Sequence, residues 1–208
     1  MLHAAPPVEM VHSAARAGAL LDPIRMQVLE RLREPDSAAG LARKLKLPRQ
    51  KLNYHLRTLE KAGFLELVEE RRKGNCIERV VRATARSFVI DPAVLGKLGA
   101  DPHDVQDKFS SAYLIALSAK TIRDVAALRV RAQKAGKRLA TFSLQSEVQF
   151  ASAADRAAFF EELTAHVARL AAKYHNETEP GGRRFELLLG SYPKLAKPAT
   201  PSPEEKST

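Results

Sequence analysis

The stretch "LPRQKLNYHLRTLEKAGFLELVEERRKGNCIERVVRAT", residues 47–84, combines a helical pattern with two strand-like runs. In its first part, Leu52, Leu56 and Leu59 are four and three residues apart, which predicts one apolar helix face. Gly63 follows at the position where a left-handed residue commonly ends a helix. The runs "FLELVEE" and "CIERVVRAT" flank "RRKGN", which predicts a β-hairpin with Gly-Asn at its turn. The stretch therefore predicts a helix followed by a hairpin.

Helix-start signals upstream of this stretch predict three more helices. A first helix is expected over residues 10–21. In "DPIRMQVLERLRE", Asp22 is the expected N-cap and a proline occupies the first helical position. Ser37 is expected to cap a short helix over "AAGLARKLKL", and Pro48 separates it from the helix that begins near Arg49. Four helices followed by a hairpin predict a winged helix-turn-helix domain.

The second half of the chain has a different pattern. A long helical pattern runs over about residues 105–135, with apolar positions near one side. "ATFSLQSEVQF" alternates between apolar and polar residues and predicts a half-buried strand. Ser152 and Asp155 resemble a capping box ahead of another helix, and "RRFELLL" predicts a second strand. Two strands and one helix make a thin core, so we expect this unit to pack on the long helix or to pair with its twin across a dimer.

These patterns predict an α+β fold: an N-terminal winged helix-turn-helix, a long dimerisation helix and a strand-helix-strand unit. The expected layout is a loose N-terminus at residues 1–9, the winged domain at 10–90, a linker at 91–104, a dimerisation and effector domain at 105–192, and a disordered tail at 193–208.

Positive charge is concentrated in the first half of the chain. The net charge is +10, and residues 1–98 hold 18 Lys/Arg against 11 Asp/Glu, a net +7. Between Ser37 and Leu59 there are six basic residues and no acidic residue. A local excess of this kind is typical of a surface that meets a polyanion such as DNA.

The helix that begins near Arg49 carries side chains suited to duplex DNA on its outward face. With its leucines turned inward, amide, phenol and guanidinium groups point outward, where they can meet base edges or phosphates. We expect Gln50, Asn53 and Tyr54 to lie at base edges, Arg49, Lys51 and Arg57 to hold phosphates, and Arg71, Arg72 and Lys73 to contact the backbone or minor groove from the wing.

At these residues the chain resembles the ArsR/SmtB-type winged-helix transcriptional regulators. The supporting segments are "DPIRMQVLERL", "AAGLARKLKLPRQKLNYHLRTLEKAGFLELVEERRKGN" and the strand that follows, within about residues 13–88. MarR- and PadR-type regulators share this fold. The resemblance implies a homodimer that binds double-stranded DNA at an imperfect inverted repeat, and usually represses a promoter. A small-molecule effector that rotates the subunits would release the DNA.

The sequence predicts no metal, cofactor or catalytic site. Many ArsR-type proteins sense metals through cysteine pairs, but Cys76 is the single cysteine here and is interpreted as a packed residue. Asp101, His103, Asp104 and Asp107 are interpreted as helix-start residues beside a linker. His55 is interpreted as a structural hydrogen-bonding residue.

No apolar run approaches the length of a membrane span and no signal peptide is recognisable, so a cytoplasmic protein with no membrane partner is expected. Two alternatives remain open: a winged-helix protein-interaction module, and a ligand-binding protein without base-specific DNA readout. No Gly-rich phosphate loop and no hydrolase motif is present, so an enzyme is not expected.

Overall fold

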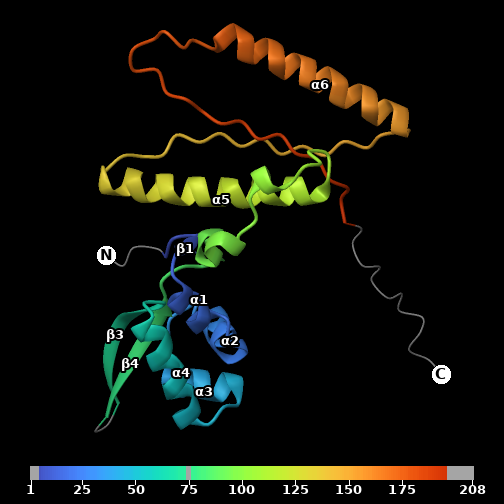
Figure 1. Cartoon of the computed structure of the whole chain (residues 1–208). Helices are drawn as coiled ribbons and strands as arrows, with labels where there is room; N and C mark the ends of the chain where they lie inside the picture. Colours follow the sequence, from blue (N-terminus) through green and yellow to red (C-terminus); the bar gives the residue numbers. More distant parts are fainter. Residues whose placement is uncertain (1–4, 74–75, 196–208) are drawn as a thin grey trace, which may run out of the picture. The chain divides into compact units, whose positions relative to one another are not determined.

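The computed structural model describes residues 5–73 and 76–195, and for Lys73 and Cys76 it describes the backbone alone (Figure 1). The chain divides into two compact units, residues 1–139 and residues 140–208. The elements of the first unit are β1 (Glu9–Val11), α1 (Ala14–Leu20), α2 (Pro23–Arg31), β2 (Asp36–Ser37), α3 (Ala38–Leu45), α4 (Arg49–Lys61), β3 (Leu65–Lys73), β4 (Cys76–Ala83), β5 (Phe88–Ile90), the short 3-10 helices η1 (Pro92–Leu98) and η2 (Pro102–Asp104), and α5 (Ser111–Lys134). The second unit contains α6 (Ala153–Tyr174).

The helices of the winged domain begin where their capping residues predict. The Asp22 carboxylate accepts hydrogen bonds from the backbone N–H groups of Ile24 and Arg25 at the start of α2. The Ser37 hydroxyl accepts from the Gly40 N–H at the start of α3. These bonds satisfy N–H groups that have no partner inside a helix.

The predicted hairpin is present as β3 and β4, and the short strand β2 extends it to a three-stranded sheet in the order β2-β4-β3. The predicted Gly-Asn turn lies outside the described residues. A register shift between Leu67 and Glu69 leaves Val68 as a bulge. The bulge explains why "FLELVEE" alternates imperfectly, because an extra residue moves the following side chains to the opposite face.

The core of the winged domain lies between the helices and the hairpin, with α2, α3 and β3 all packed against α4. Its fully buried side chains are Val11, Val28, Leu32, Leu41, Leu52, Leu59 and Phe64. Each such burial contributes roughly 1.5–3 kcal/mol of transfer free energy. The inward stripe predicted for α4 is confirmed at Leu52 and Leu59, and Leu56 is half-buried.

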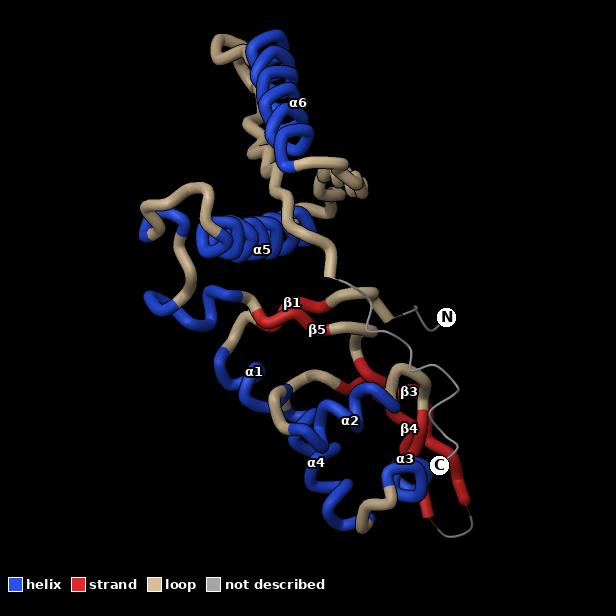
Figure 2. The backbone as a smooth tube through the Cα atoms, turned by 90° about the vertical axis from the view of Figure 1, so that its right-hand side faces the viewer, coloured by secondary structure: helices blue, strands red, loops and turns tan. Residues whose placement is uncertain are grey.

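The N-terminal part of the domain differs from the expectation in two ways. The predicted helix over residues 10–21 is shorter, because Glu9–Val11 form β1 and pair in parallel with β5 (Figure 2). The residues before β1 are also held in place. The Pro6 carbonyl accepts from the Arg86 N–H at 3.0 Å, and the Glu9 carboxylate accepts from the Thr84 hydroxyl at 2.7 Å. The prediction of a loose N-terminus at residues 1–9 is therefore wrong for Pro6 and Glu9, which are hydrogen-bonded to the rest of the domain.

The stretch expected to be a linker, residues 91–104, contains η1 and η2, and both contact α5. Asp91 and Asp101 cap these short helices. The Arg123 guanidinium on α5 donates to the Ala100 carbonyl at 3.2 Å. The predicted long helix begins later than expected, at Ser111, because the Ser110 hydroxyl accepts from the Tyr113 N–H and sets the start of the helix there.

In the second unit the predicted helix is present and the two predicted strands are not. Residues 140–150 and 183–189 run without strand hydrogen bonding in the described structure. Their alternating apolar side chains remain exposed, for example Phe142 at 84% and Phe185 at 71%. The physical reason is that alternation predicts an extended chain with one apolar face, but a strand also needs a neighbouring backbone and a surface to cover that face.

Candidate nucleic-acid interface

The helices α3 and α4 are joined by a tight turn of the helix-turn-helix kind. Lys46 ends α3 in the left-handed conformation, with φ of 52°, and the Leu47 N–H donates to the Ala42 carbonyl at 3.1 Å. Pro48 then precedes α4 and makes no side-chain capping hydrogen bond. The first N–H groups of α4 are therefore not satisfied by a cap, and such groups at the start of a helix attract anions.

The outward face of α4 carries most of the predicted DNA-contact residues. Gln50 and Arg57 are exposed, and Tyr54 is 64% exposed. Asn53 is half-buried, so its amide is less accessible than predicted. Four of the residues around these positions, Leu52, His55, Leu56 and Leu59, face the core or lie half-buried, which fixes the rotation of the helix.

The basic residues predicted to hold phosphates are available on this surface. Arg49, Lys51 and Arg57 are exposed, and within the described part of the chain none of them lies in an ion pair. Arg43 and Lys46, from α3 and the turn, are exposed close by in sequence. A guanidinium or ammonium group without an internal carboxylate partner can neutralise a phosphate without first breaking an ion pair.

The wing is less uniform than predicted. Arg71 and Arg72 are exposed near the end of β3, but the Arg71 guanidinium is paired with the Glu69 carboxylate. For Arg72 the described residues offer no ion-pair partner. The side chain of Lys73 lies outside the described residues. Arg72 is thus the described wing cation most available for a phosphate.

Ion pairs hold the wing against α4. The Arg79 guanidinium on β4 donates to the Glu60 carboxylate at 2.6 Å, and its Nε lies 3.9 Å from Glu70 Oε1. The Glu60 carboxylate raises the pKa of Arg79 above its ordinary value, first through the hydrogen bond and then through its charge. At the start of α3, the hydroxyl of its N-cap residue Ser37 donates a hydrogen bond to the Glu78 carboxylate on β4 at 2.6 Å. The Arg79–Glu60 pair thus adds a polar contact between β4 and α4 to the apolar packing of β3 on α4.

A buried histidine anchors α4 to the start of α2. His55 is 5% exposed, and its Nδ1 lies 3.8 Å from Asp22 Oδ1 without a hydrogen-bond partner among the described residues. The pKa of Asp22 is lowered, first by the backbone N–H of Arg25, against the opposing effect of burial, and further by the charges of Arg25 and His55. His55 is buried, but in place of the expected hydrogen bond its Nδ1 only approaches the Asp22 carboxylate at 3.8 Å.

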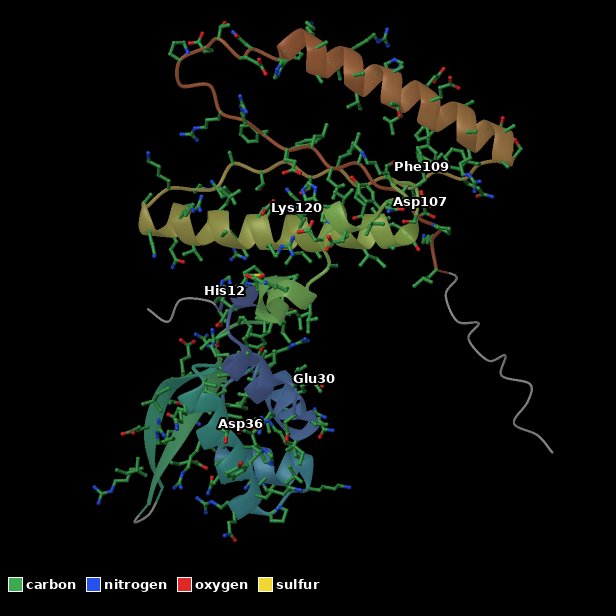
Figure 3. All side chains as sticks on the ribbon, in the orientation of Figure 1. His12, Glu30, Asp36, Asp107, Phe109 and Lys120 are labelled. Carbon is green, nitrogen blue, oxygen red and sulfur yellow. The ribbon has the colours of Figure 1, made fainter. Side chains whose placement is uncertain are left out.

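No metal centre is assembled by the described residues: nowhere do three or more His, Cys, Asp or Glu side chains gather as a metal would need. Asp101 caps η2, and the Asp107 carboxylate accepts from the Phe109 N–H just before α5 (Figure 3). Asp101 and Asp107 thus each accept a local backbone hydrogen bond. Over the described ranges, no helix has the length and apolar character to span a membrane.

Comparison with protein families gives one relevant match, to the family described as "Helix-turn-helix domain", over residues 20–68. The matched residues run from the end of α1 through α2, α3 and α4 into β3. The match and the observed geometry support a helix-turn-helix DNA-binding regulator with an α+β winged fold in this part of the chain. Comparison with curated proteins gives no match.

Three solved structures are similar to this chain, and the titles of two of them name a transcriptional regulator. A possible transcriptional regulatory protein (fragment 1–100) from Mycobacterium bovis has 22% identity over 35% of this chain and 73% of its own, with a TM-score of 0.29. NolR from Sinorhizobium fredii has 26% identity over 42% and 77%, with a TM-score of 0.29. A PadR family transcriptional regulator from Eggerthella lenta DSM 2243 has 20% identity over 58% and 81%, with a TM-score of 0.27.

Sequence reasoning missed two features of this surface. The uncapped start of α4 was signalled by Pro48, which has neither a side-chain acceptor nor an N–H. The contribution of Arg79 had no local signal, because Arg79 and Glu60 are 19 residues apart and meet only through the hairpin register.

Proposed function

We propose that the chain is a cytoplasmic, homodimeric, sequence-specific regulator of transcription of the ArsR/SmtB type, which represses a promoter by binding an inverted repeat in double-stranded DNA. One observation carries the proposal. Opposite a buried stripe, α4 presents an amide, a phenol and three unpaired cations on one exposed surface. No carboxylate interrupts the sequence from Ser37 to Leu59, so this surface is suited to a polyanion.

Within this proposal the residues have different roles. Gln50, Asn53 and Tyr54 lie at or beside base edges, where an amide can pair with adenine in the major groove. Arg49, Lys51 and Arg57 hold phosphates, and the open N-terminus of α4 adds backbone N–H donors for another phosphate. Arg71, Arg72 and Lys73 follow the backbone from the wing. Phosphate contacts set the orientation, and base contacts set the sequence.

The proposed homodimer uses α5. Ile115 and Ile122 are seven residues apart on this 24-residue helix, and they are 63% and 38% exposed. A spacing of seven residues places both on one side of the helix, as in helices that pair. Of the other apolar residues expected near one side of this helix, Leu114, Leu117 and Val125 are half-buried, whereas Leu128 is 44% exposed, and Phe109, just before the helix, is fully exposed. An effector that changes the packing of α5 would change the distance between the two recognition helices and release the DNA.

The proposal is tested by replacing Asn53 and Arg57 together with alanine. Bidentate base contacts contribute about 1–3 kcal/mol each and each phosphate contact adds about 0.9 to the salt slope. We therefore expect operator affinity to fall at least about tenfold and the salt dependence to become shallower. Binding is measured by fluorescence anisotropy at several salt concentrations, and circular dichroism checks the fold.

The matched control replaces Lys134, an exposed cation at the end of α5, with alanine. Operator affinity should then stay within twofold of wild type. If the double variant at Asn53 and Arg57 binds the operator as tightly as wild type, α4 is not the recognition helix.

A further inference from the structure

The described residues of the second unit form no buried core of their own. In the described residues 140–195 none is buried, and α6 contains no buried residue along its 22 positions. Twelve large apolar side chains are exposed there by 37–90%: Phe142, Leu144, Val148, Phe159, Leu170, Tyr174, Phe185, Leu187, Leu188, Leu189, Tyr192 and Leu195. A folded monomer rarely leaves so many large apolar groups in water.

The exposed apolar residues before α6 alternate as they would on one face of a strand. Phe150 contacts Phe159 and Phe160 at the start of α6, with ring centroids 5.3 and 6.0 Å apart. Side chains alternate along a strand, so Phe142, Leu144 and Val148, which have the same parity as Phe150, would share its face if this segment formed one. This face would continue for eight residues before Phe150, yet Phe142 and Leu144 are 84% and 79% exposed.

The segment after α6, residues 183–189, also has alternating apolar side chains that are exposed. Phe185, Leu187 and Leu189 alternate and are 53–71% exposed. Five residues beyond Leu189, Lys194 Nζ forms an ion pair with Glu147 Oε2 at 2.6 Å, so the chain after this segment returns to residues 140–150. Both segments carry backbone N–H and C=O groups outside any strand of the described structure, and a β-sheet would pair them.

Area and charge together indicate what covers this surface. A fully exposed aromatic side chain presents roughly 200 Å² and an aliphatic one less, so the five aromatic and seven aliphatic side chains expose in total on the order of 1,000 Å². The largest apolar patch of a typical monomer is about 300–600 Å², whereas a stable interface takes about 800 Å² from each partner. Residues 140–195 hold 6 Lys/Arg and 7 Asp/Glu, a net charge of −1. A nearly neutral surface does not repel its own copy and has no excess charge to attract a nucleic acid or an anionic membrane.

We propose that residues 140–195 are completed by a second copy of this chain, with residues 140–150 and 183–189 of both copies forming one β-sheet whose apolar face packs on α6. This proposal rests on the homodimer proposed above and adds to it a second interface. The dimer is then held at both α5 and the second unit, and the sheet sets how the two α5 helices are presented to one another.

The test compares two variants of the full-length protein that place the same charges on opposite faces of one segment. Phe142→Glu with Leu144→Glu puts carboxylates on the apolar face, and Ser143→Glu with Gln145→Glu puts them on the polar face. Sedimentation velocity over a range of protein concentrations measures the dimer dissociation constant. We expect the apolar-face variant to raise this constant at least about 100-fold and the polar-face variant to change it less than fivefold.

Amide hydrogen exchange on the wild-type dimer supplies a second measurement that does not depend on any variant. Residues 140–150 and 183–189 should be protected at dimeric concentrations and lose protection on dilution to monomer. Rapid exchange of both segments in the dimer overturns the proposal.

The failures of the two proposals can be distinguished. Equal dissociation constants for the two variants, with a dimer retained, would overturn the shared sheet and leave the α5 dimer standing. A monomeric wild-type chain at tens of micromolar would overturn both dimer interfaces and leave the long helix of the same chain or a foreign protein as the occupant of this surface. Operator binding, measured separately, tests α4 alone.

Discussion

The winged domain and the second unit have similar local sequence patterns but different structures. In the winged domain, Leu52, Leu59 and Phe64 on α4 and the start of the hairpin are fully buried. In residues 140–195, Phe142, Leu144 and Phe185 follow an equally regular pattern and remain exposed. The difference is in what surrounds them. Three helices and a sheet close around α4, whereas one helix cannot cover two extended segments.

This contrast shows what a periodic pattern establishes. Periodicity predicts which face of an element is apolar, and capping residues predict where the element begins. Neither signal predicts which other part of the protein covers the apolar face. Where the cover comes from the same chain, as in the winged domain, the pattern and the structure agree.

The largest expected effect is on the closed core. Phe64 is fully buried, packs edge-on against Phe88 with ring centroids 5.1 Å apart, and has the Arg16 guanidinium 4.6 Å above its ring. Phe64→Ala should lower the free energy of unfolding by about 3–5 kcal/mol. The matched change Phe142→Ala should leave the winged domain unaffected. Hydrogen exchange of the α4 amides measures the stability of the winged domain in each variant. Equal protection of these amides in Phe64→Ala and Phe142→Ala would contradict the claim that only Phe64 is part of a closed core.

Alanine substitutions at two glycines of the winged domain should change its stability by a smaller amount, in opposite directions. Gly63 has φ of +72° and Gly18 lies inside α1, and a Cβ added at either would meet no atom within 4 Å. Gly63→Ala should destabilise by about 1–2 kcal/mol, because an L-residue is strained in the left-handed region. Gly18→Ala should stabilise by about 0.5–1 kcal/mol, because alanine loses less backbone entropy in a helix. Urea denaturation gives both values, and a destabilising Gly18→Ala would contradict the assignment of α1.

The next effect concerns the cap of α2. Asp22→Ala should lower stability by about 0.5–2 kcal/mol at neutral pH, because two backbone N–H groups lose their acceptor. The pKa of Asp22 is lowered on folding, so its carboxylate stabilises the protein fully above its ordinary value of 3.8. That contribution is lost as the pH falls through the lower folded value. Denaturation of wild type and variant from pH 7 to pH 2.5 should show the two stabilities converging at acid pH, and a constant difference would argue against this role.

The smallest effects are expected at the exposed ion pairs of the two regions. The Arg79–Glu60 pair in the winged domain and the Lys194–Glu147 pair in the second unit are both at 2.6 Å, with side-chain exposures of 48%/41% and 70%/70%. Double-mutant cycles should give about 0.2–1 kcal/mol for Arg79–Glu60 and a smaller value for Lys194–Glu147. Both couplings should weaken in high salt. If the coupling energy of Lys194–Glu147 exceeded that of Arg79–Glu60, this would indicate that the Lys194–Glu147 pair is buried in the dimer.

The parts of the fold predicted correctly from the sequence depend on local signals. Asp22 and Ser37 mark helix starts through bonds to residues two or three positions away, and Gly63 marks a helix end through its own backbone conformation. The pairing of β1 with β5 was not predicted, because its partners, such as Met10 and Val89, are far apart in the sequence. Parallel pairing of such distant short strands has no periodic signal.

The candidate site was predicted to a similar extent. Helical geometry correctly places Gln50, Tyr54 and Arg57 on the exposed face of α4, since the buried stripe fixes the rotation. It did not foresee that Asn53 is half-buried, or that Glu69 neutralises Arg71. Those outcomes depend on neighbouring side chains and on the bulge at Val68, which changes the facing of the strand residues after it.

Selection of genomic DNA fragments by the purified full-length protein, followed by salt-dependent binding to the recovered fragments and to random duplex, tests the central claim most directly. The proposed function predicts one inverted-repeat motif, with half-sites about one helical turn apart and an affinity roughly a thousandfold above that for random DNA. Uniform binding to all fragments, with the same steep salt dependence, would contradict sequence-specific recognition by α4.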